Sequence, residues 1–291
     1  MPDDNDFKTI RYETPLSSVA RIVLNRPEVA NAQDIQMIYE LNEAFDRAAF
    51  DDAVKVVILA AEGRHFSSGH DLGDQAKVSD FASVNNWGGY EKPGAEGWMA
   101  TEQEIYFGMC WRWRNLPKPT IAQVHGKTIA GGLMLIWICD LIIADEDATF
   151  SDPVVAFGVN GVEYFAHPWE VGARKAKEML FTGEAFSAQE AHRLGMINHV
   201  VPPKALETFT LDLAARIAQR PSMGLKLAKQ SVNQALDAQG LWTALQAAMS
   251  LQQLGHSHNM QVHGLPVDPT GIEVIKNMSK KKDPGGGEKD D

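Results

Sequence analysis

Hydrophobic positions along the first half of the chain follow two alternating periods. Apolar residues recur at helical spacing from Ile35 through Ile38, Leu41 and Phe45, with polar Asn42 between them. Five short segments have the alternating or continuously apolar composition of strands: 7–13, 19–25, 54–60, 120–124 and 140–144. Because strands and helices alternate, the pattern predicts an α/β fold with crossover connections.

The second half of the chain is mostly helical in pattern. Ser187 and Glu190 form an S-x-x-E capping box, and the helix that they open is predicted to end at Gly195. The segment from Leu72 to Trp98 is rich in Gly, Asn, Ser and Asp and has weak periodicity, so we expect a long mobile loop of the kind that covers ligands. Residues 281–291 are charged and glycine-rich, and we expect them to be disordered.

Composition narrows the class of protein. The 291 residues are 44% hydrophobic, which supports a sizeable core, and the net charge of −11 argues against sequence-independent binding of nucleic acid. The start of the chain is too polar for a signal peptide, and the longest apolar run includes Asp140 and is too short to span a bilayer. Cys110 and Cys139 lie among apolar residues without metal-ligand spacing. We therefore expect a cytoplasmic protein with no membrane partner.

Several common catalytic motifs are missing. The Gly-Lys-Thr at 126–128 lacks the earlier glycine of a phosphate loop, because Ile121 stands there. No G-x-G-x-x-G follows a strand, and His65 replaces the first glycine of a serine-hydrolase elbow. His256 and His258 have no third ligand nearby in the sequence, so surface positions are expected rather than a metal site.

Three segments together resemble the crotonase superfamily, typified by enoyl-CoA hydratase. They are RHFSSGHDL (64–72), PTIAQVHGKTIAGGLMLIWICDLIIADEDATFSDP (119–153) and LFTGEAFSAQEAHRLGMINHVVP (180–202). The resemblance covers roughly residues 8–240. It implies a crotonase-like ββα superhelix over residues 1–200 and a C-terminal helical trimerisation region over residues 201–280. It also implies homotrimers that often stack as hexamers.

The resemblance also implies an oxyanion hole for an acyl-CoA thioester, built from the backbone N–H groups of His70 and Gly131. A thioester that becomes an enolate places negative charge on one oxygen, and preorganised donors at a helix N-terminus stabilise that charge. Coenzyme A would enter as part of the substrate, without a permanently bound cofactor or metal. The His70 side chain is not required in this interpretation, and Asp71 is expected to fix the loop or cap a following helix.

The chain departs from the family where the hydratases carry their two glutamates. Met134 and Val154 stand at these positions, and neither can transfer a proton, so ordinary two-glutamate hydration is not expected. Glu163 is a substitute, because its apolar neighbours favour a raised pKa. The alternative for Glu163 is a loop carboxylate paired with a surface cation. Asp152 is a weaker candidate because it precedes a proline and shapes a turn.

The segment CWRWRNLPKP (110–119) has two interpretations. Arg112 and Arg114 either meet the phosphates of coenzyme A, or the tryptophans beside them pack a helix against the sheet or a neighbouring subunit. Packing is favoured.

The sequence thus predicts an enoyl-CoA hydratase/isomerase-like enzyme, a lyase or isomerase that works through a thioester enolate with His70, Gly131 and Glu163 in its site. Two alternatives remain open. One is a protein that binds acyl-CoA without catalysis, and the other is a different crotonase reaction such as thioester hydrolysis or C–C cleavage.

Overall fold

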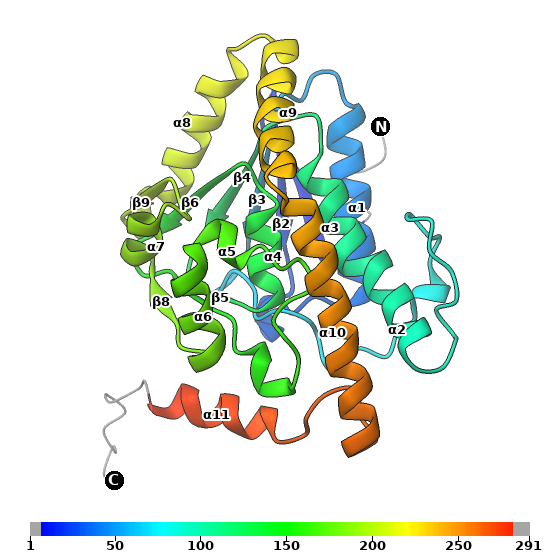
Figure 1. Ribbon diagram of the computed structural model, residues 1–291. Helices are drawn as coiled ribbons and strands as arrows, with labels where there is room; N and C mark the ends of the chain where they lie inside the picture. Colours follow the sequence, from blue (N-terminus) through cyan, green and yellow to red (C-terminus); the bar gives the residue numbers. More distant parts are fainter. Residues whose placement is uncertain (1–6, 282–291) are drawn as a thin grey trace.

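The central element of the computed structural model, which describes residues 7–281, is a six-stranded sheet. Its strand order is β1-β2-β3-β4-β6-β9, and every pair is parallel except β1 and β2 (Figure 1). The strands are β1 (Ile10–Leu16), β2 (Val19–Leu24), β3 (Val56–Ala61), β4 (Thr120–Val124), β6 (Leu141–Asp145) and β9 (His199–Val201). The strands expected from the apolar pattern are therefore present, with ends shifted by up to three residues, and the first turn is tighter than expected.

A smaller sheet has the strand order β5-β7-β8, with bounds Lys127–Ile129, Thr149–Ser151 and Phe186–Ser187. It is joined to the preceding loop by a bridge between Ser67 and Thr128. Helix α4 (Gly131–Trp137) leaves β5 directly and is buried along its whole length. This small sheet and its buried helix place the residues that the sequence singled out.

Two apolar cores lie on opposite sides of the large sheet. The larger contains the apolar side of α1 (Ile35–Phe50), together with α4 and the inward residues of β2, β3 and β4. The smaller forms where α8 (Leu206–Ala218) covers the other side, with Leu206 and Ala214 against Ile58 and Ile143. Helix α8 therefore belongs to the folded body, and β9 ends one residue beyond the predicted 1–200 core.

The remaining helices surround these cores. They are α2 (Ala95–Glu102), the π-helix η3 (Gln103–Gly108), α3 (Met109–Arg114), α5 (His167–Glu170), α6 (Gly172–Thr182), α7 (Ala188–Leu194), α9 (Ser222–Ala238), α10 (Leu241–His263) and α11 (Gly271–Lys281). The long α10 runs beside α2 and α3, and α11 lies across the end of the molecule (Figure 1). Half of the expected capping box is present, because the Ser187 hydroxyl accepts from the N–H of Glu190, whereas the Glu190 carboxylate pairs with Arg193.

Short 3₁₀ turns join several elements: η1 (Pro27–Val29), η2 (Val78–Asp80), η4 (Val154–Phe157) and η5 (Pro203–Ala205). The predicted loop 72–98 contains η2 and the start of α2. Glu104 holds part of it, accepting from the N–H groups of Val84 and Asn85 at 2.6 and 2.9 Å. Lys281 belongs to α11, and the rest of the predicted disordered tail lies outside the described residues.

Candidate active site

The loop that carries His70 is held against two other segments. Gln33 forms a parallel bridge with His70: its N–H donates to the carbonyl of Gly69 at 2.8 Å, and its carbonyl accepts from Asp71 at 2.9 Å. Gly69 has φ of 95°, and a Cβ there would lie 3.1 Å from the nitrogen of Gly131. Glycine is thus required at position 69 for the two backbones to approach.

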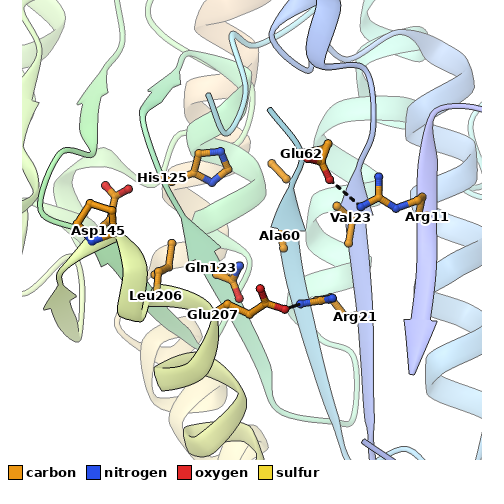
Figure 2. A pocket seen from close by; sticks show the side chains of 12 residues that line it. Arg11, Arg21, Val23, Ala60, Glu62, Gln123, His125, Asp145, Leu206 and Glu207 are labelled. Carbon is orange, nitrogen blue, oxygen red and sulfur yellow. Dashed lines mark hydrogen bonds and ion pairs between the residues drawn. The ribbon is translucent and has the colours of Figure 1, made fainter. Parts of the chain in front are cut away.

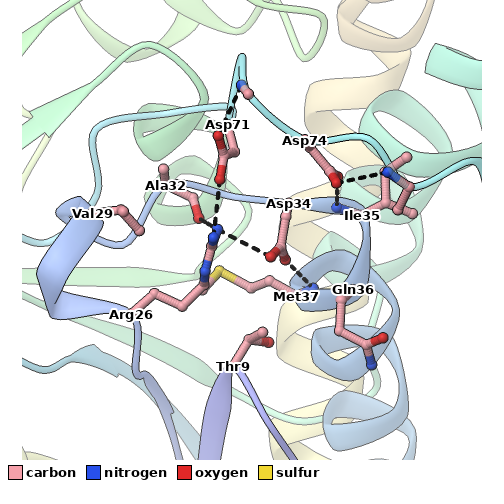
Figure 3. Close-up of polar contacts among 12 residues, drawn as sticks. Thr9, Arg26, Val29, Ala32, Asp34, Ile35, Gln36, Met37, Asp71 and Asp74 are labelled. Carbon is pink, nitrogen blue, oxygen red and sulfur yellow. Dashed lines mark hydrogen bonds and ion pairs between the residues drawn. The ribbon is translucent and has the colours of Figure 1, made fainter.

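Asp71 fixes this loop, as one of its two expected roles requires. Its carboxylate accepts from the N–H of Gly73 at 3.0 Å and lies 3.0 Å from the guanidinium of Arg26. Figure 3 shows Arg26 between Asp71 and Asp34, which caps α1 by accepting from the N–H of Met37. One arginine therefore ties the His70 loop to the start of the first helix.

Gly131 begins α4 next to a strained residue. Ala130 has φ of 48°, a conformation that costs free energy for a residue with a Cβ. Two backbone hydrogen bonds hold it there, to Ser151 and from Leu133. A Cβ on Gly131 would lie 2.6 Å from the Nε2 of His70, so the imidazole rests directly on this glycine. Among residues 7–281, no protein acceptor is found for the backbone N–H of either His70 or Gly131.

Glu163 lies in the loop between η4 and α5, and the fold turns it inward. Its side chain is 7% exposed, and its Oε2 lies 3.8 Å from the Nε2 of His70. Both atoms are buried without a hydrogen-bond partner within the described part of the chain. The surface ion-pair interpretation of Glu163 is therefore wrong, because the carboxyl is buried and no Lys or Arg among residues 7–281 forms an ion pair with it.

Asp152 and His167 hold the Glu163 loop at its two ends. The His167 Nε2 and the Asp152 Oδ2 lie 2.7 Å apart, and neither side chain is exposed. Asp152 also accepts from the N–H groups of Val154 and Val162. These three contacts make Asp152 a residue that shapes the turn.

The π-helix η3 carries an aromatic side chain that packs against His70. The Tyr106 ring stacks on the His70 ring with centroids 3.7 Å apart and an angle of 7° between the planes. π-Helical turns are frequent at functional sites. Just before this turn, Glu102 forms an ion pair with His256 of α10 at 2.9 Å and accepts from Gln253. His256 is therefore buried, and its expected surface position is wrong.

Burial dominates the electrostatics of the site. It raises the pKa of Glu163 well above the usual value, and the charges of Glu102 and Asp152 raise it further. Burial lowers the pKa of His70 to about 4, against an opposing effect of Asp152. The pKa of Tyr106 is raised as well, first by burial and then by Glu163. Burial thus favours the protonated form of the Glu163 carboxyl and the uncharged form of the His70 imidazole.

The two residues at the positions of the hydratase glutamates, Met134 and Val154, also have apolar surroundings in the structure. Met134 is 1% exposed and belongs to the larger core, and Val154 packs partly buried against the same core. No carboxylate replaces them at these points of the chain. Proton transfer therefore depends on other groups.

The tryptophan-rich segment has a packing role, as favoured. Trp113 is buried and donates to Asn42 of α1. Arg112 pairs with Asp46 at 2.6 Å, and Arg114 pairs with Asp237 of α9 at 3.0 Å. Both guanidinium groups thus bind protein carboxylates.

A hollow of about 410 Å³ lies on the side of the sheet that α8 covers (Figure 2). Two ion pairs lie in its lining: Arg11 with Glu62 at 2.8 Å and Arg21 with Glu207 at 2.5 Å. It contains none of the site residues predicted from the sequence. We do not assign it a role.

Sequence reasoning missed Tyr106, His167 and Glu102. Tyr106 could not be distinguished from the other aromatic residues at helical spacing. His167 is a single histidine in an apolar segment, a pattern that by itself indicates no function. The only available signal for His167 was its place after the Glu163 loop. Their contacts join segments far apart in the chain.

Comparison with known proteins identifies the family to which the chain belongs. Residues 15–266 match the family model for enoyl-CoA hydratase/isomerase. The chain is 46% identical to the putative enoyl-CoA hydratase EchA13 of Mycobacterium tuberculosis, over 89% of this chain and 84% of that protein.

Two solved structures have the same architecture. A probable enoyl-CoA hydratase from Mycobacterium smegmatis is 47% identical with a TM-score of 0.81, covering 89% of this chain and 99% of that one. An enoyl-CoA hydratase/isomerase from Xanthobacter autotrophicus Py2 is 33% identical with a TM-score of 0.77, covering 94% and 98%. The chain therefore belongs to the enoyl-CoA hydratase/isomerase family of enzymes, within the crotonase superfamily, and it has the crotonase fold.

Proposed function

We propose that the protein acts on acyl-CoA thioesters through an enolate, with the N–H groups of His70 and Gly131 as oxyanion donors and Glu163 as the proton carrier. One observation carries this proposal: the buried Glu163 carboxyl lies 3.8 Å from the His70 ring, which itself rests on Gly131. Three residues that are distant in sequence thus meet at one place. The relatives named enoyl-CoA hydratase support a CoA-thioester substrate.

The environment of Glu163 suits proton transfer at the α-carbon. A general acid works best when its pKa lies near the operating pH, and burial moves Glu163 in that direction. The two backbone N–H groups are free to donate, so enolate charge on the thioester oxygen is stabilised without rearrangement of the protein. In this role coenzyme A is part of the substrate, and the chemistry requires no permanently bound cofactor.

Incubation with a panel of acyl-CoAs in heavy water, followed by mass spectrometry, tests this function. Deuterium at the α-carbon is expected for at least one acyl group. Tight binding without exchange, hydration or cleavage would instead support the second candidate, a catalytically silent acyl-CoA-binding protein. The apolar Met134 and Val154 are the observation that keeps this candidate in view.

We also propose a homotrimer, alone or stacked as a hexamer. Large apolar side chains are exposed along the C-terminal helices, among them Leu227 and Val232 of α9 and Leu251 and Leu254 of α10. Contiguous exposed apolar surface of this kind marks contacts between subunits. Sedimentation equilibrium tests the proposal, and a monomeric mass at micromolar concentration would contradict it.

A further inference from the structure

Unpartnered buried polar atoms gather around Gly131. His70 Nε2 and Glu163 Oε2 have no hydrogen-bond partner, and neither does the Oε1 of Gln33. The Gln33 oxygen would lie 3.3 Å from a Cβ on Gly131, and the His70 nitrogen 2.6 Å from it. Buried polar atoms are almost always paired, so three unpaired atoms at one place indicate a polar ligand that is bound during function.

Neighbouring residues hold His70 and Glu163 in place, but no direct hydrogen bond joins their side chains. Tyr106 stacks on His70 from one side, and Asp152 with His167 fixes the loop of Glu163 from the other. The remaining 3.8 Å between Nε2 and Oε2 is too long for a direct hydrogen bond. An oxygen atom placed to one side of the line that joins them can, however, lie about 2.8 Å from each, which is the normal length of such a bond.

We propose that the His70 imidazole is a second acid–base group, and that it holds a substrate water together with Glu163. His70 and Glu163 would together transfer the protons that the two glutamates transfer in hydratases. Met134 and Val154, which stand at those two positions, cannot transfer protons. The inference rests on the proposed function, because it requires a 2-enoyl-CoA in the site. It gives the His70 side chain a role in addition to that of its backbone N–H.

The proposed reaction is the addition of water to a 2-enoyl-CoA, which needs no oxidant or reductant. The water oxygen bonds to the β-carbon while its proton passes to Nε2 of the neutral imidazole. The electron pair of the C=C bond moves toward the thioester, and the enolate oxygen is held by the two N–H groups. Glu163 then gives its proton to the α-carbon. The product is a 3-hydroxyacyl-CoA.

The pair is restored by one further proton transfer. After the reaction, an imidazolium and a carboxylate face each other across 3.8 Å, and the proton returns from Nε2 to Oε2. The new carboxylate also stabilises the imidazolium, which offsets the burial that lowers the pKa of His70. Because both atoms are closed to solvent, the substrate reaches them only after a covering side chain moves, and the Tyr106 ring contacts His70 directly.

The test compares hydration with α-carbon exchange in the same protein. Hydration of 2-enoyl-CoAs of short, medium and long chain is followed by loss of the enoyl absorbance, and exchange by deuterium uptake into the saturated acyl-CoAs. The wild-type protein is expected to hydrate at least one of them. His70→Gln is expected to lower the hydration kcat by about 10²–10⁴-fold and to lower the ratio of hydration to exchange by at least about tenfold.

Controls separate catalysis from structure. His258→Gln changes an exposed histidine and is expected to leave both rates within twofold of wild type. His70→Asn serves as the second variant if His70→Gln does not keep the wild-type melting temperature. The acid limb of the kcat/KM profile for hydration is expected to disappear in the His70 variant that folds.

Three results would overturn the inference. Exchange without hydration in the wild type would leave Glu163 as the only proton carrier, and an unchanged ratio in a folded His70 variant would limit His70 to its backbone role. Neither exchange nor hydration with any acyl-CoA would refute the proposed function, and this inference with it.

Discussion

Asp152 and His167 share a contact of 2.7 Å between two side chains that have no solvent exposure. They lie on either side of the loop that bears Glu163, so the contact closes that loop at its base. The same carboxylate accepts two backbone N–H groups inside the loop. The position of Glu163 therefore depends on a group that does not itself touch the proposed reacting atoms.

Asp152→Ala is expected to lower the free energy of unfolding by at least about 3 kcal/mol, because it leaves the His167 nitrogen and two backbone N–H groups buried without acceptors. Urea denaturation measures the change. Asp212→Ala, at an exposed position of α8, is the matched control and should change stability by less than about 0.5 kcal/mol. A similar small effect for both variants would remove the structural role of Asp152.

Glu163→Gln is expected to keep the shape of the site and to lower turnover by about 10²–10⁴-fold. Its melting temperature should change little or rise, because an unpaired buried carboxyl is costly. Rate on the identified substrate and calorimetric affinity for a saturated acyl-CoA are measured together. Unchanged turnover in a folded variant would exclude Glu163 from the mechanism.

The stability difference between Glu163→Gln and wild type is expected to grow as pH rises above 4.5. The folded state raises the pKa of Glu163 from 4.5, so above that pH the unfolded state binds fewer protons and wild-type stability falls with pH up to the folded pKa. The slope approaches about 1.4 kcal/mol per pH unit.

The contribution of His70 to stability changes with pH in the opposite direction, and it does so over a lower pH range. Its pKa falls from 6.5 to about 4, so its contribution is present above pH 6.5 and is lost toward pH 4. Glu102, Asp152 and Tyr106 also act on the carboxyl or are affected by its charge, and the variant keeps all three. Urea denaturation of both proteins from pH 4.5 to 9 measures the difference, and a constant value over this range would show that Glu163 has no raised pKa.

Gly131→Ala is expected to displace the His70 ring, because the new methyl group would lie 2.6 Å from its Cδ2 and Nε2. Turnover should fall by at least tenfold, as expected when a reacting group is misplaced by about 1 Å. Gly224→Ala in α9 has open space around it and is the control, with a gain in stability of about 0.5–1 kcal/mol and unchanged turnover. Full activity of Gly131→Ala would contradict the close approach of His70 to this glycine.

The position of the oxyanion donors is a separate prediction. In a crystal structure with a bound acyl-CoA, the N–H groups of His70 and Gly131 should both lie about 3 Å from the thioester oxygen. A complex in which the two nitrogens face different cavities would disprove the assignment.

Local patterns in the sequence determined the elements and part of the site. The apolar runs that became β3 and β4, the helical spacing from Ile35 and the N-cap at Ser187 depend on neighbours within a few residues, so the chain alone specifies them. The requirement for glycine at position 131 also follows from local residue types, whereas the sequence left open whether Glu163 lies inward or on the surface.

Only the tertiary structure decided what those residues contact. The stacking of Tyr106 on His70, the pairing of Asp152 with His167 and the burial of His256 against Glu102 each join segments that are not neighbours in the chain. Residue type did not reveal these contacts, since the same histidine is equally compatible with a surface position. Burial decides which pKa values shift and which polar atoms are left unpaired, and burial arises from the packing of whole helices and sheets rather than from any short segment.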